Sequence, residues 1–402
     1  MRILTKNLLI PLFLMISLFT RGQSLCDTLP FIECDQNKII VNEADSNLTN
    51  FIHKLQAGNS EKIRIVHIGD SHLQAGFLTE KIKQFLFQYI SPIDNFASPG
   101  FLFPYTVAQT NNPFFYKVKS TGDWEWCKNV DKDKSCKLGL SGITVRTNSS
   151  RSTISIKMQN QKYTYPVKYF FDKVKLLYNT DSSIQIMING KESISEDGYS
   201  FVQLDNLTDS VLIHIANNDT SNYVELYGII LDNDLSKINY HTIGVNGATA
   251  QSYLKCDFLS DHLRIINPDL VILSLGTNEA YNKDFSNLKH EFELKDLIYQ
   301  IRDISPKAAI ILTTPNDHLK DGNIKNDNIQ LVRDNILKIG NEFQLSIWDF
   351  YSIMGGENSI HDWYKKGLTG QDKLHFKRIG YEIQGELFAK ALIDLIEKNG
   401  IK

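Results

Sequence analysis

The segment 63-IRIVHIGDSH-72 decides the expected fold of this chain. It begins with β-branched apolar side chains at Ile63, Ile65, Val66 and Ile68. A run of this kind is typical of a strand that is buried on both faces of a parallel sheet. Gly-Asp-Ser ends the run, and apolar residues at helical spacing follow between positions 78 and 90. We therefore predict that Ser71 lies where a buried strand ends and a helix is about to begin.

The predicted position of Ser71 favours a catalytic role for its hydroxyl group. Ligands of open α/β sheets bind beyond the carboxyl ends of the strands. Backbone N–H groups at the start of the next helix can also stabilise a developing negative charge. Gly-Asp-Ser is equally ordinary turn chemistry, so a capping role for Ser71 is the alternative. The rest of the chain has to distinguish the two interpretations.

The N-terminus has the pattern of a secretory signal peptide. Arg2 and Lys6 precede an apolar run over residues 8–19, and small residues mark a cleavage site after Gly22. The run is too short to span a bilayer comfortably, which makes an uncleaved anchor the less favoured alternative. We expect a secreted protein, located in the periplasm or cell envelope, from which residues 1–22 have been removed.

Charge and hydropathy limit the expected partners. The formal net charge is −3 at pH 7, and loss of Arg2, Lys6 and Arg21 with the signal peptide changes it to −6. Nucleic-acid binding needs a basic face, so nucleic acid is not an expected partner. No later stretch is long and apolar enough to span a membrane. The sequence does not predict an oligomeric state.

Five cysteines follow residue 22. In an oxidising compartment, Cys26 with Cys34 and Cys127 with Cys136 are close enough in sequence to close small loops. Cys256 is left over and is expected to be a small buried residue. No Cys/His cluster has the spacing of a zinc site, and the sequence predicts neither a metal nor another cofactor.

The chain divides into an N-terminal leader (23–45), a discontinuous α/β domain (46–110 and 236–402) and an inserted β-rich module (111–235). The module has short β-like runs, and Asn189-Gly190 predicts a hairpin after one of them. Such spacing is typical of a β-sandwich. The aromatic-rich segment 95–105, just before the module, is expected to form a loop near the site. The strands expected in the module are 143–146, 153–158, 174–178, 184–188, 211–215 and 223–231.

The α/β pattern returns from residue 238. Apolar strands are expected at 270–275, 308–312 and 345–350, and a last helix at 378–398. One helix between them is predicted from apolar residues at Phe292, Leu294, Leu297, Ile298 and Ile301. This strand–helix alternation predicts a three-layer, doubly wound parallel sheet.

Four polar segments fall at strand ends or in loops of the α/β domain. Nucleophilic acyl transfer needs a hydroxyl, a base, a group that orients the base, and donors for the oxyanion. Ser71 supplies the hydroxyl, and His375 is the natural base because its reference pKa is close to neutrality. Asp372 could orient His375. The N–H groups of Ser71 and Gly247, with the side-chain amide of Asn278, could face the oxyanion.

Gly69-Asp70-Ser71, Gly247, Asn278 and Asp372…His375 occur in the order of the four sequence blocks of the SGNH (GDSL-like) hydrolases, which the chain resembles. The resemblance implies a three-layer, flavodoxin-like fold. It also implies Ser71 as nucleophile, Asp372 and His375 as the rest of a triad, and an oxyanion hole made by Ser71, Gly247 and Asn278. One departure is Lys373, which stands where the family more often has glycine.

Two further details resemble bacterial peptidoglycan O-acetylesterases: Gly69-Asp70-Ser71-His72, and Gly276-Thr277-Asn278-Glu279-Ala280. Those enzymes carry a carbohydrate-binding-like β-module between the first two blocks, where 111–235 falls here. The resemblance implies a serine esterase that removes O-acetyl groups from a cell-wall glycan, with peptidoglycan first. The alternatives are an acetylesterase or acetyltransferase acting on another polysaccharide, and a secreted glycan-binding protein without catalysis.

Taken singly, each candidate has a structural interpretation. Asn278 and Gly247 could be turn residues, and Asp372 could cap a helix. Their joint order and placement favour catalysis. Two more residues, His72 and Glu279, are candidates for lining the pocket. Three aromatic residues of the module could stack on sugars, although such residues in a small sandwich are more often core: Tyr116, Trp124 and Trp126.

Overall fold

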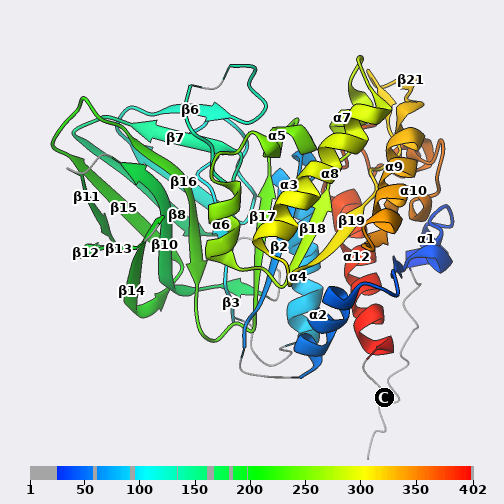
Figure 1. Ribbon diagram of the computed structural model, residues 1–402, viewed down its shortest axis with the longest axis horizontal. Helices are drawn as coiled ribbons and strands as arrows, with labels where there is room; N and C mark the ends of the chain where they lie inside the picture. Colours follow the sequence, from blue (N-terminus) through cyan, green and yellow to red (C-terminus); the bar gives the residue numbers. More distant parts are fainter. Residues whose placement is uncertain are drawn as a thin grey trace, which may run out of the picture.

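The structure is a computed structural model that describes residues 25–57, 61–90, 96–133, 135–160, 167–180, 184–196 and 198–399. The predicted signal peptide, 1–22, lies outside these residues. The described part of the leader holds a short helix α1 (Leu25–Thr28), a 3-10 turn (Cys34–Gln36) and strand β1 (Ile39–Ile40). Figure 1 shows two regions side by side, a sheet with helices and a group of antiparallel strands.

The first region contains the predicted parallel sheet. Five of its six strands are parallel, and β1 joins one edge in the antiparallel direction. Across the sheet the strands are β1, β22 (Ser346–Trp348), β19 (Ala309–Thr313), β18 (Leu270–Ser274), β2 (Ile63–Gly69) and β17 (Ile238–Gly244). Numbered along the chain from β2, the parallel strands have the order 2-1-3-4-5 of flavodoxin-like folds. The predicted fold class is confirmed.

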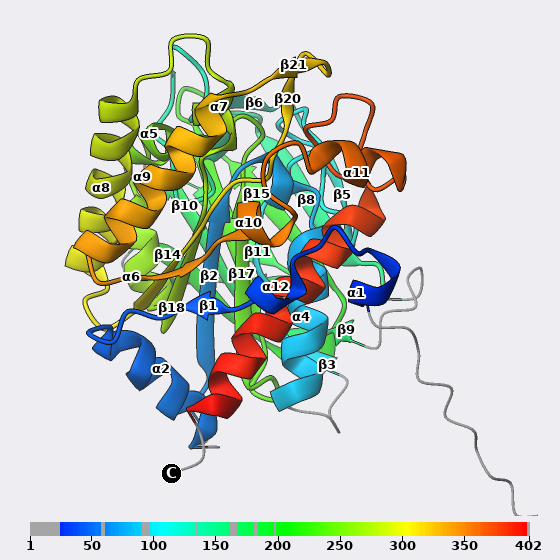
Figure 2. The ribbon, with the colours of Figure 1, turned by 90° about the vertical axis from the view of Figure 1, so that its right-hand side faces the viewer.

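Helices cover both faces of the parallel sheet (Figure 2). One face carries α4 (Phe77–Ile90) and α12 (Arg378–Lys398), with α2 (Ser46–Gln56) beside α12. The other face carries α6 (Leu259–Ile266), α8 (Asn287–Ile304) and α9 (Asn328–Glu342).

One apolar position of α8 was predicted wrongly. Leu294, Leu297, Ile298 and Ile301 are buried, but the side chain of Phe292 is 70% exposed. Phe292 precedes Leu294 by two residues, and a separation of two turns the side chain to the opposite side of a helix. Phe292 therefore points away from the sheet.

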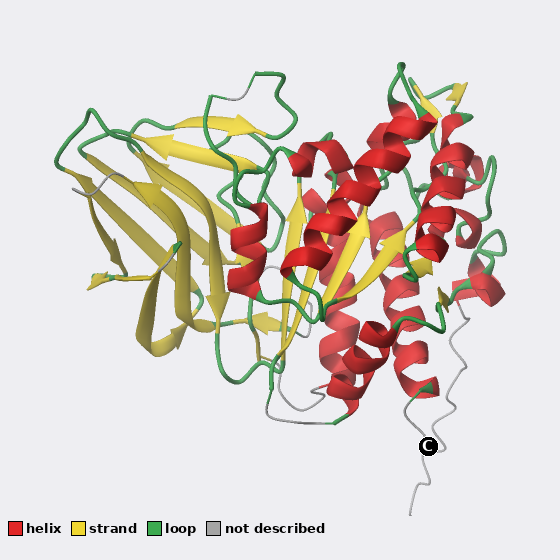
Figure 3. Ribbon diagram, viewed as in Figure 1, coloured by secondary structure: helices red, strands yellow, loops and turns green. Residues whose placement is uncertain are grey.

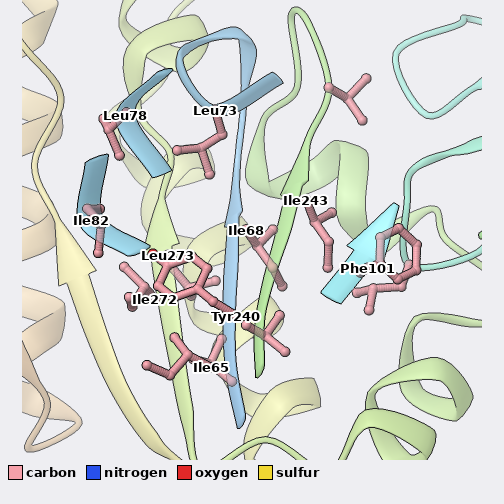
Figure 4. Packing of buried hydrophobic residues seen from close by; sticks show 14 of the residues in the cluster. Ile65, Ile68, Leu73, Leu78, Ile82, Phe101, Tyr240, Ile243, Ile272 and Leu273 are labelled. Carbon is pink, nitrogen blue, oxygen red and sulfur yellow. The ribbon is translucent and has the colours of Figure 1, made fainter. Parts of the chain in front are cut away.

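The apolar residues of β2 form the centre of the core. Ile65, Val66 and Ile68 are at most 1% exposed. Figure 4 shows Ile65 and Ile68 among side chains of the flanking strands β17 and β18, with Leu73 at the end of the strand. This packing on both faces is the reason for the uninterrupted β-branched run in the sequence.

The second region consists of two antiparallel sheets that pack face to face (Figure 3). In β8 (Arg151–Met158) and β15 (Ser210–Asn217), every second residue is buried, as expected for the inner face of a sandwich. One sheet contains β13 (Ile194–Glu196), β14 (Tyr199–Thr208), β10 (Phe171–Thr180), β16 (Val224–Asp232), β7 (Ile143–Thr147), β6 (Glu125–Lys128) and β4 (Gly100–Leu102). The other contains β12 (Lys191–Glu192), β11 (Ile184–Ile188), β15, β8 and β5 (Tyr116–Thr121).

The hairpin predicted at Asn189-Gly190 is confirmed. Ile188 of β11 pairs with Lys191 of β12, and both turn residues have positive φ (+50° and +78°). Tight two-residue hairpin turns of type I′ need this conformation, which Asn-Gly adopts at low cost.

Segment 95–105 differs from the loop that the sequence predicted, because its residues 96–102 join the two regions. Strand β4 pairs with β16, and Gly100 (φ +80°) lies so close to β17 that an added Cβ would be 2.5 Å from the Tyr240 carbonyl oxygen. Tyr105 extends toward the carboxyl end of β17, where its hydroxyl donates to the Gly244 carbonyl (3.0 Å). Since β4 precedes residue 111, the antiparallel sheet that contains β16 begins before the predicted boundary of the module. The division of the chain into domains stays a prediction.

Both expected disulfides, Cys26–Cys34 and Cys127–Cys136, are formed, and Cys256 is buried and takes part in neither of them. Within the described ranges, no helix is both long and apolar enough to cross a membrane.

Candidate active site

Ser71 is the first residue of the short helix α3 (Ser71–Gln74), which directly follows β2. Asp70 caps this helix, because its carboxylate accepts a hydrogen bond from the His72 N–H (2.9 Å). Gly69 permits the close approach of β2 to its neighbours, since a Cβ there would lie 2.7 Å from the Ser274 carbonyl oxygen of β18 and 2.6 Å from the Leu73 side chain. The position agrees with the prediction from the sequence, and the Ser71 side chain is left partly exposed at the carboxyl edge of the sheet.

Ser71, His375 and Asp372 lie together, although Ser71 and His375 are 304 residues apart. The Ser71 Oγ is 3.0 Å from His375 Nε2, and His375 Nδ1 is 2.8 Å from an Asp372 carboxylate oxygen. If Nδ1 carries the proton that is donated to Asp372, Nε2 is left to accept from the serine hydroxyl. The three side chains therefore have the connectivity of a nucleophile, a base and an orienting acid.

The loop before α12 fixes Asp372 and His375. The Gly370 N–H donates to the His375 carbonyl (2.8 Å), and the backbone N–H groups of Leu374 and His375 donate to the Asp372 carboxylate (both 3.2 Å). Lys373 has φ +46°, in the left-handed region that favours glycine. Lys373 thus adopts a backbone conformation that glycine reaches more easily than other residues.

Asp372 stays ionised at neutral pH. Partial burial opposes ionisation, but the hydrogen bonds from the His375 ring and from two backbone N–H groups hold the pKa of Asp372 below its usual value. The side chains of His375 and Asp372 remain 42% and 49% exposed. The three residues are therefore open to a large substrate and to water.

Gly247 and Asn278 follow the strands on either side of β2, namely β17 and β18. Gly247 is exposed with φ +84°, and its N–H makes no hydrogen bond to the described residues. Asn278 lies in α7 (Thr277–Tyr281), and its amide nitrogen donates to the Ala248 carbonyl (2.9 Å) and to Asp70 (3.2 Å). The longer bond, to Asp70, is the one that an oxyanion could replace.

Glu279 is one of the two predicted pocket residues, and it is only 6% exposed. Its two carboxylate oxygens accept hydrogen bonds from the Ala250 N–H (2.9 Å) and the Gly276 N–H (3.0 Å). These bonds tie the segment after Gly247 to the segment before Asn278. Burial raises the pKa of Glu279 to about 7. The buried carboxylate of Glu279 thus links the segment that contains Gly247 to the segment that contains Asn278.

His72, the other predicted pocket residue, is buried and packs against His375. The two rings are stacked, with centroids 5.4 Å apart and an angle of 27° between the planes. His72 Nδ1 is 3.1 Å from the Tyr381 hydroxyl. Burial lowers the pKa of His72 well below its usual value, so the ring is neutral and does not repel a protonated His375.

Sequence reasoning missed two residues of this environment, Asp70 and Tyr381. Asp70 is 1% exposed, and burial raises its pKa to about 7 although it accepts hydrogen bonds. Asp70 is part of Gly-Asp-Ser, so its position next to Ser71 in the sequence was a signal that it lies near the site. Its contact with Asn278 had no such signal, because that contact depends on the fold. Tyr381 is on α12 and reaches His72 only through tertiary packing.

The predicted sugar-stacking aromatics of the module differ in exposure. Tyr116 is buried, and its hydroxyl donates to the Phe103 carbonyl (2.7 Å), so it belongs to the core and cannot stack on a sugar. Trp124 and Trp126 are partly exposed. Within the described residues there is no group of three or more His, Cys, Asp and Glu side chains that could hold a metal ion.

Residues 205–383 match the model of the GDSL-like lipase/acylhydrolase family. The match includes Gly247, Asn278, Asp372 and His375, whereas Ser71 lies before it, on the other side of most of the antiparallel strands. No curated protein sequence matches the chain significantly.

Several solved structures are similar to this one. A structure of a peptidoglycan O-acetylesterase matches with a TM-score of 0.73 and 22% identity, over 89% of this chain and 97% of its own. An acetylxylan esterase from Geobacillus stearothermophilus matches with a TM-score of 0.32 and 16% identity, over 39% of this chain and 72% of its own. A putative acylhydrolase from Bacteroides fragilis matches with a TM-score of 0.32 and 19% identity, over 39% and 76%.

The first of these matches shows that the fold is shared. Because it extends over 89% of the chain, it includes much of the antiparallel region as well as the parallel sheet. Residues 205–383 therefore match a GDSL-like lipase/acylhydrolase domain, which indicates a carboxylic ester hydrolase, and most of the chain shares its fold with the peptidoglycan O-acetylesterase structure.

Proposed function

We propose that this protein is a secreted serine esterase that removes O-acetyl groups from a cell-wall glycan, with peptidoglycan as the first candidate. The observation that carries the proposal is the hydrogen-bonded series from Ser71 through His375 to Asp372. The shared fold with a peptidoglycan O-acetylesterase and the predicted signal peptide support the choice of substrate and location.

The first half of the reaction forms an acetyl-enzyme. His375 Nε2 takes the proton of Ser71 as Oγ attacks the ester carbonyl. The resulting oxyanion faces the N–H groups of Ser71 and Gly247 and the Asn278 amide, which turns from Asp70 to the substrate. His375 then gives its proton to the departing sugar hydroxyl, and the acetyl group stays on Ser71.

Water completes the reaction. His375 accepts a proton from the attacking water, a second oxyanion forms at the same donors, and acetate leaves as Ser71 recovers its proton. The exposure of His375 and Asp372 lets solvent reach the acetyl-enzyme. This openness favours hydrolysis over transfer of the acetyl group to another sugar, which requires exclusion of water.

The test is acetate release from O-acetylated peptidoglycan by the purified mature protein and by Ser71→Ala. We expect Ser71→Ala to lose activity by at least about a thousandfold, since it removes the nucleophile. Ser120→Ala, at an exposed serine of β5, is the matched control and should keep full activity. Undiminished turnover by Ser71→Ala would exclude the mechanism, and absence of acetate release by the wild type would exclude the substrate.

A further inference from the structure

The outer face of the five-stranded sheet carries a hollow of about 450 Å³. Its lining includes three lysines, Lys117 and Lys119 of β5 and Lys157 of β8, which we call the lysine hollow. Neutral hydrogen-bonding side chains, Ser155 and Gln159 among them, line the same space. The hollow therefore combines positive charge with groups that can bind hydroxyl or amide groups of a ligand.

The charge of the lysine hollow is poorly balanced by the protein. Lys117 and Lys157 are directly opposite each other in the β5–β8 register, an arrangement in which like charges destabilise a sheet. The one acidic residue in the lining is Asp209, whose carboxylate is 3.7 Å from Lys157 Nζ. Because the whole chain is net acidic, this concentration of lysines does not follow from composition. An anionic ligand would relieve the repulsion.

The lysine hollow is structurally linked to the active site. Gln159 in its lining donates backbone and side-chain hydrogen bonds to the carbonyls of Phe115 and Phe114. The Phe114 N–H in turn donates to the carbonyl of Ala75 (3.4 Å), four residues after Ser71. The edge of the hollow is thus held against the segment that follows the nucleophile.

Phe114, which takes part in these hydrogen bonds, has a partly exposed ring that pairs with the partly exposed ring of Phe77. The rings of Phe77 and Phe114 are stacked with centroids 4.6 Å apart, and the Arg378 guanidinium lies 5.9 Å from each ring. Arg378 follows His375 by three residues and also pairs with Glu382. An extended polymer that occupied the lysine hollow could cross this pair on its way to Ser71.

We propose that the lysine hollow binds the carboxylate groups of an anionic glycan and so retains the polymer whose acetyl ester reaches Ser71. The inference rests on the proposed function and names a substrate class for it, a glycan that carries carboxylates. Peptidoglycan fits this class because its stem peptides bear carboxylates, whereas chitin has related N-acetylated sugars without them. Exposed ion pairs of this kind weaken as salt is added.

The experiment measures cosedimentation of Ser71→Ala full-length mature protein with insoluble peptidoglycan and with chitin, at low and high salt. The test variant adds Lys117→Gln, Lys119→Gln and Lys157→Gln. The matched control instead adds Lys38→Gln, Lys307→Gln and Lys398→Gln, three exposed lysines outside the antiparallel region. We expect the test variant to bind peptidoglycan about tenfold more weakly at low salt, equivalent to about 1.4 kcal/mol, and the control variant to bind normally.

Chitin binding should be weaker than peptidoglycan binding and equal in all three proteins. The inference is overturned if the test variant binds peptidoglycan as well as the control does, or if it loses chitin and peptidoglycan binding equally. With Ser71 restored, the three lysine substitutions should leave hydrolysis of p-nitrophenyl acetate unchanged and raise KM on O-acetylated peptidoglycan. Since binding is measured without catalysis, the inference can fail or succeed independently of the proposed esterase activity.

Discussion

The active-site edge of the parallel sheet and the lysine hollow of the antiparallel region differ in the burial of their charged residues. In the parallel-sheet region, Asp70 and Glu279 are buried beside the carboxyl ends of β2 and β18. In the antiparallel region, β8 and β15 bury one side and leave the other to solvent, where Lys157 is 67% exposed. The difference separates two tasks. Buried groups position a reacting atom, and exposed charges can retain a polymer.

The sharpest test of this separation is His375→Ala. Removal of the base should lower kcat/KM on a small acetate ester by at least about a thousandfold. Binding of the same variant to insoluble peptidoglycan should be unchanged, because the lysine hollow is intact. His214→Ala, at an exposed histidine of β15, is the control and should alter neither measurement. A large loss of glycan binding in His375→Ala would show that the tasks are not separate.

Asn278→Ala tests the expected oxyanion donor. Removal of one such donor typically lowers kcat by about 10²–10³-fold. We expect kcat to fall within this range with little change in KM, measured by steady-state hydrolysis of p-nitrophenyl acetate. Asn206→Ala, at an exposed position of β14, provides the matched comparison. An equal effect of both substitutions, or a change confined to KM, would contradict the assignment.

His72 should act as a positioning residue through its stacked ring. His72→Ala removes the ring that lies against His375, and we expect kcat to fall about tenfold because proximity and orientation of the base contribute to rate. His72→Phe keeps a flat ring and should restore most of the activity. If Phe and Ala lowered kcat equally, the Tyr381 hydrogen bond would explain the effect and the stacked ring would not.

A smaller effect should appear in the pH dependence of stability. The folded-state pKa of Asp70 is raised to about 7 from an unfolded value near 3.8, so the folded state holds this proton more tightly. The contribution of Asp70 to the free energy of unfolding is therefore complete below pH 3.8 and is lost as the pH rises toward 7. The stability of the wild type relative to Asp70→Asn should fall between pH 4.5 and about 8, as measured by guanidinium unfolding.

Asp349→Asn is the control for this experiment. Burial opposes ionisation of Asp349, but its hydrogen bonds and ion pair with Arg333 hold its pKa below the usual value, so its contribution to stability is complete above the unfolded value and is lost only at more acidic pH. The difference between the wild type and Asp349→Asn should therefore be constant from pH 4.5 to 8. A flat difference for Asp70→Asn as well would contradict the raised pKa.

Much of the fold and the candidate site could be predicted from local patterns. The β-branched run of β2 identified a strand buried on both faces, and Asn189-Gly190 identified a hairpin. Ser71, Gly247 and Asn278 could be placed together because each follows a strand of one parallel sheet, and the carboxyl ends of such strands share an edge.

Other features depend on tertiary contacts that leave no local signal. The Asp70–Asn278 bond, the stack of His72 on His375 and the position of β4 each join segments far apart in the chain. Glu279 looked like a pocket residue because it follows Asn278, but its side chain turns inward to two backbone N–H groups. The sequence alone does not distinguish these two directions.

The central claim is that the Ser71 hydroxyl is the nucleophile. Treatment of the folded mature protein with a fluorophosphonate, followed by peptide mass mapping, tests it most directly because the reagent labels activated serines covalently. We predict a single adduct, located on Ser71, that disappears in His375→Ala. An adduct on another serine, or an active enzyme that remains unlabelled at Ser71, would contradict the account.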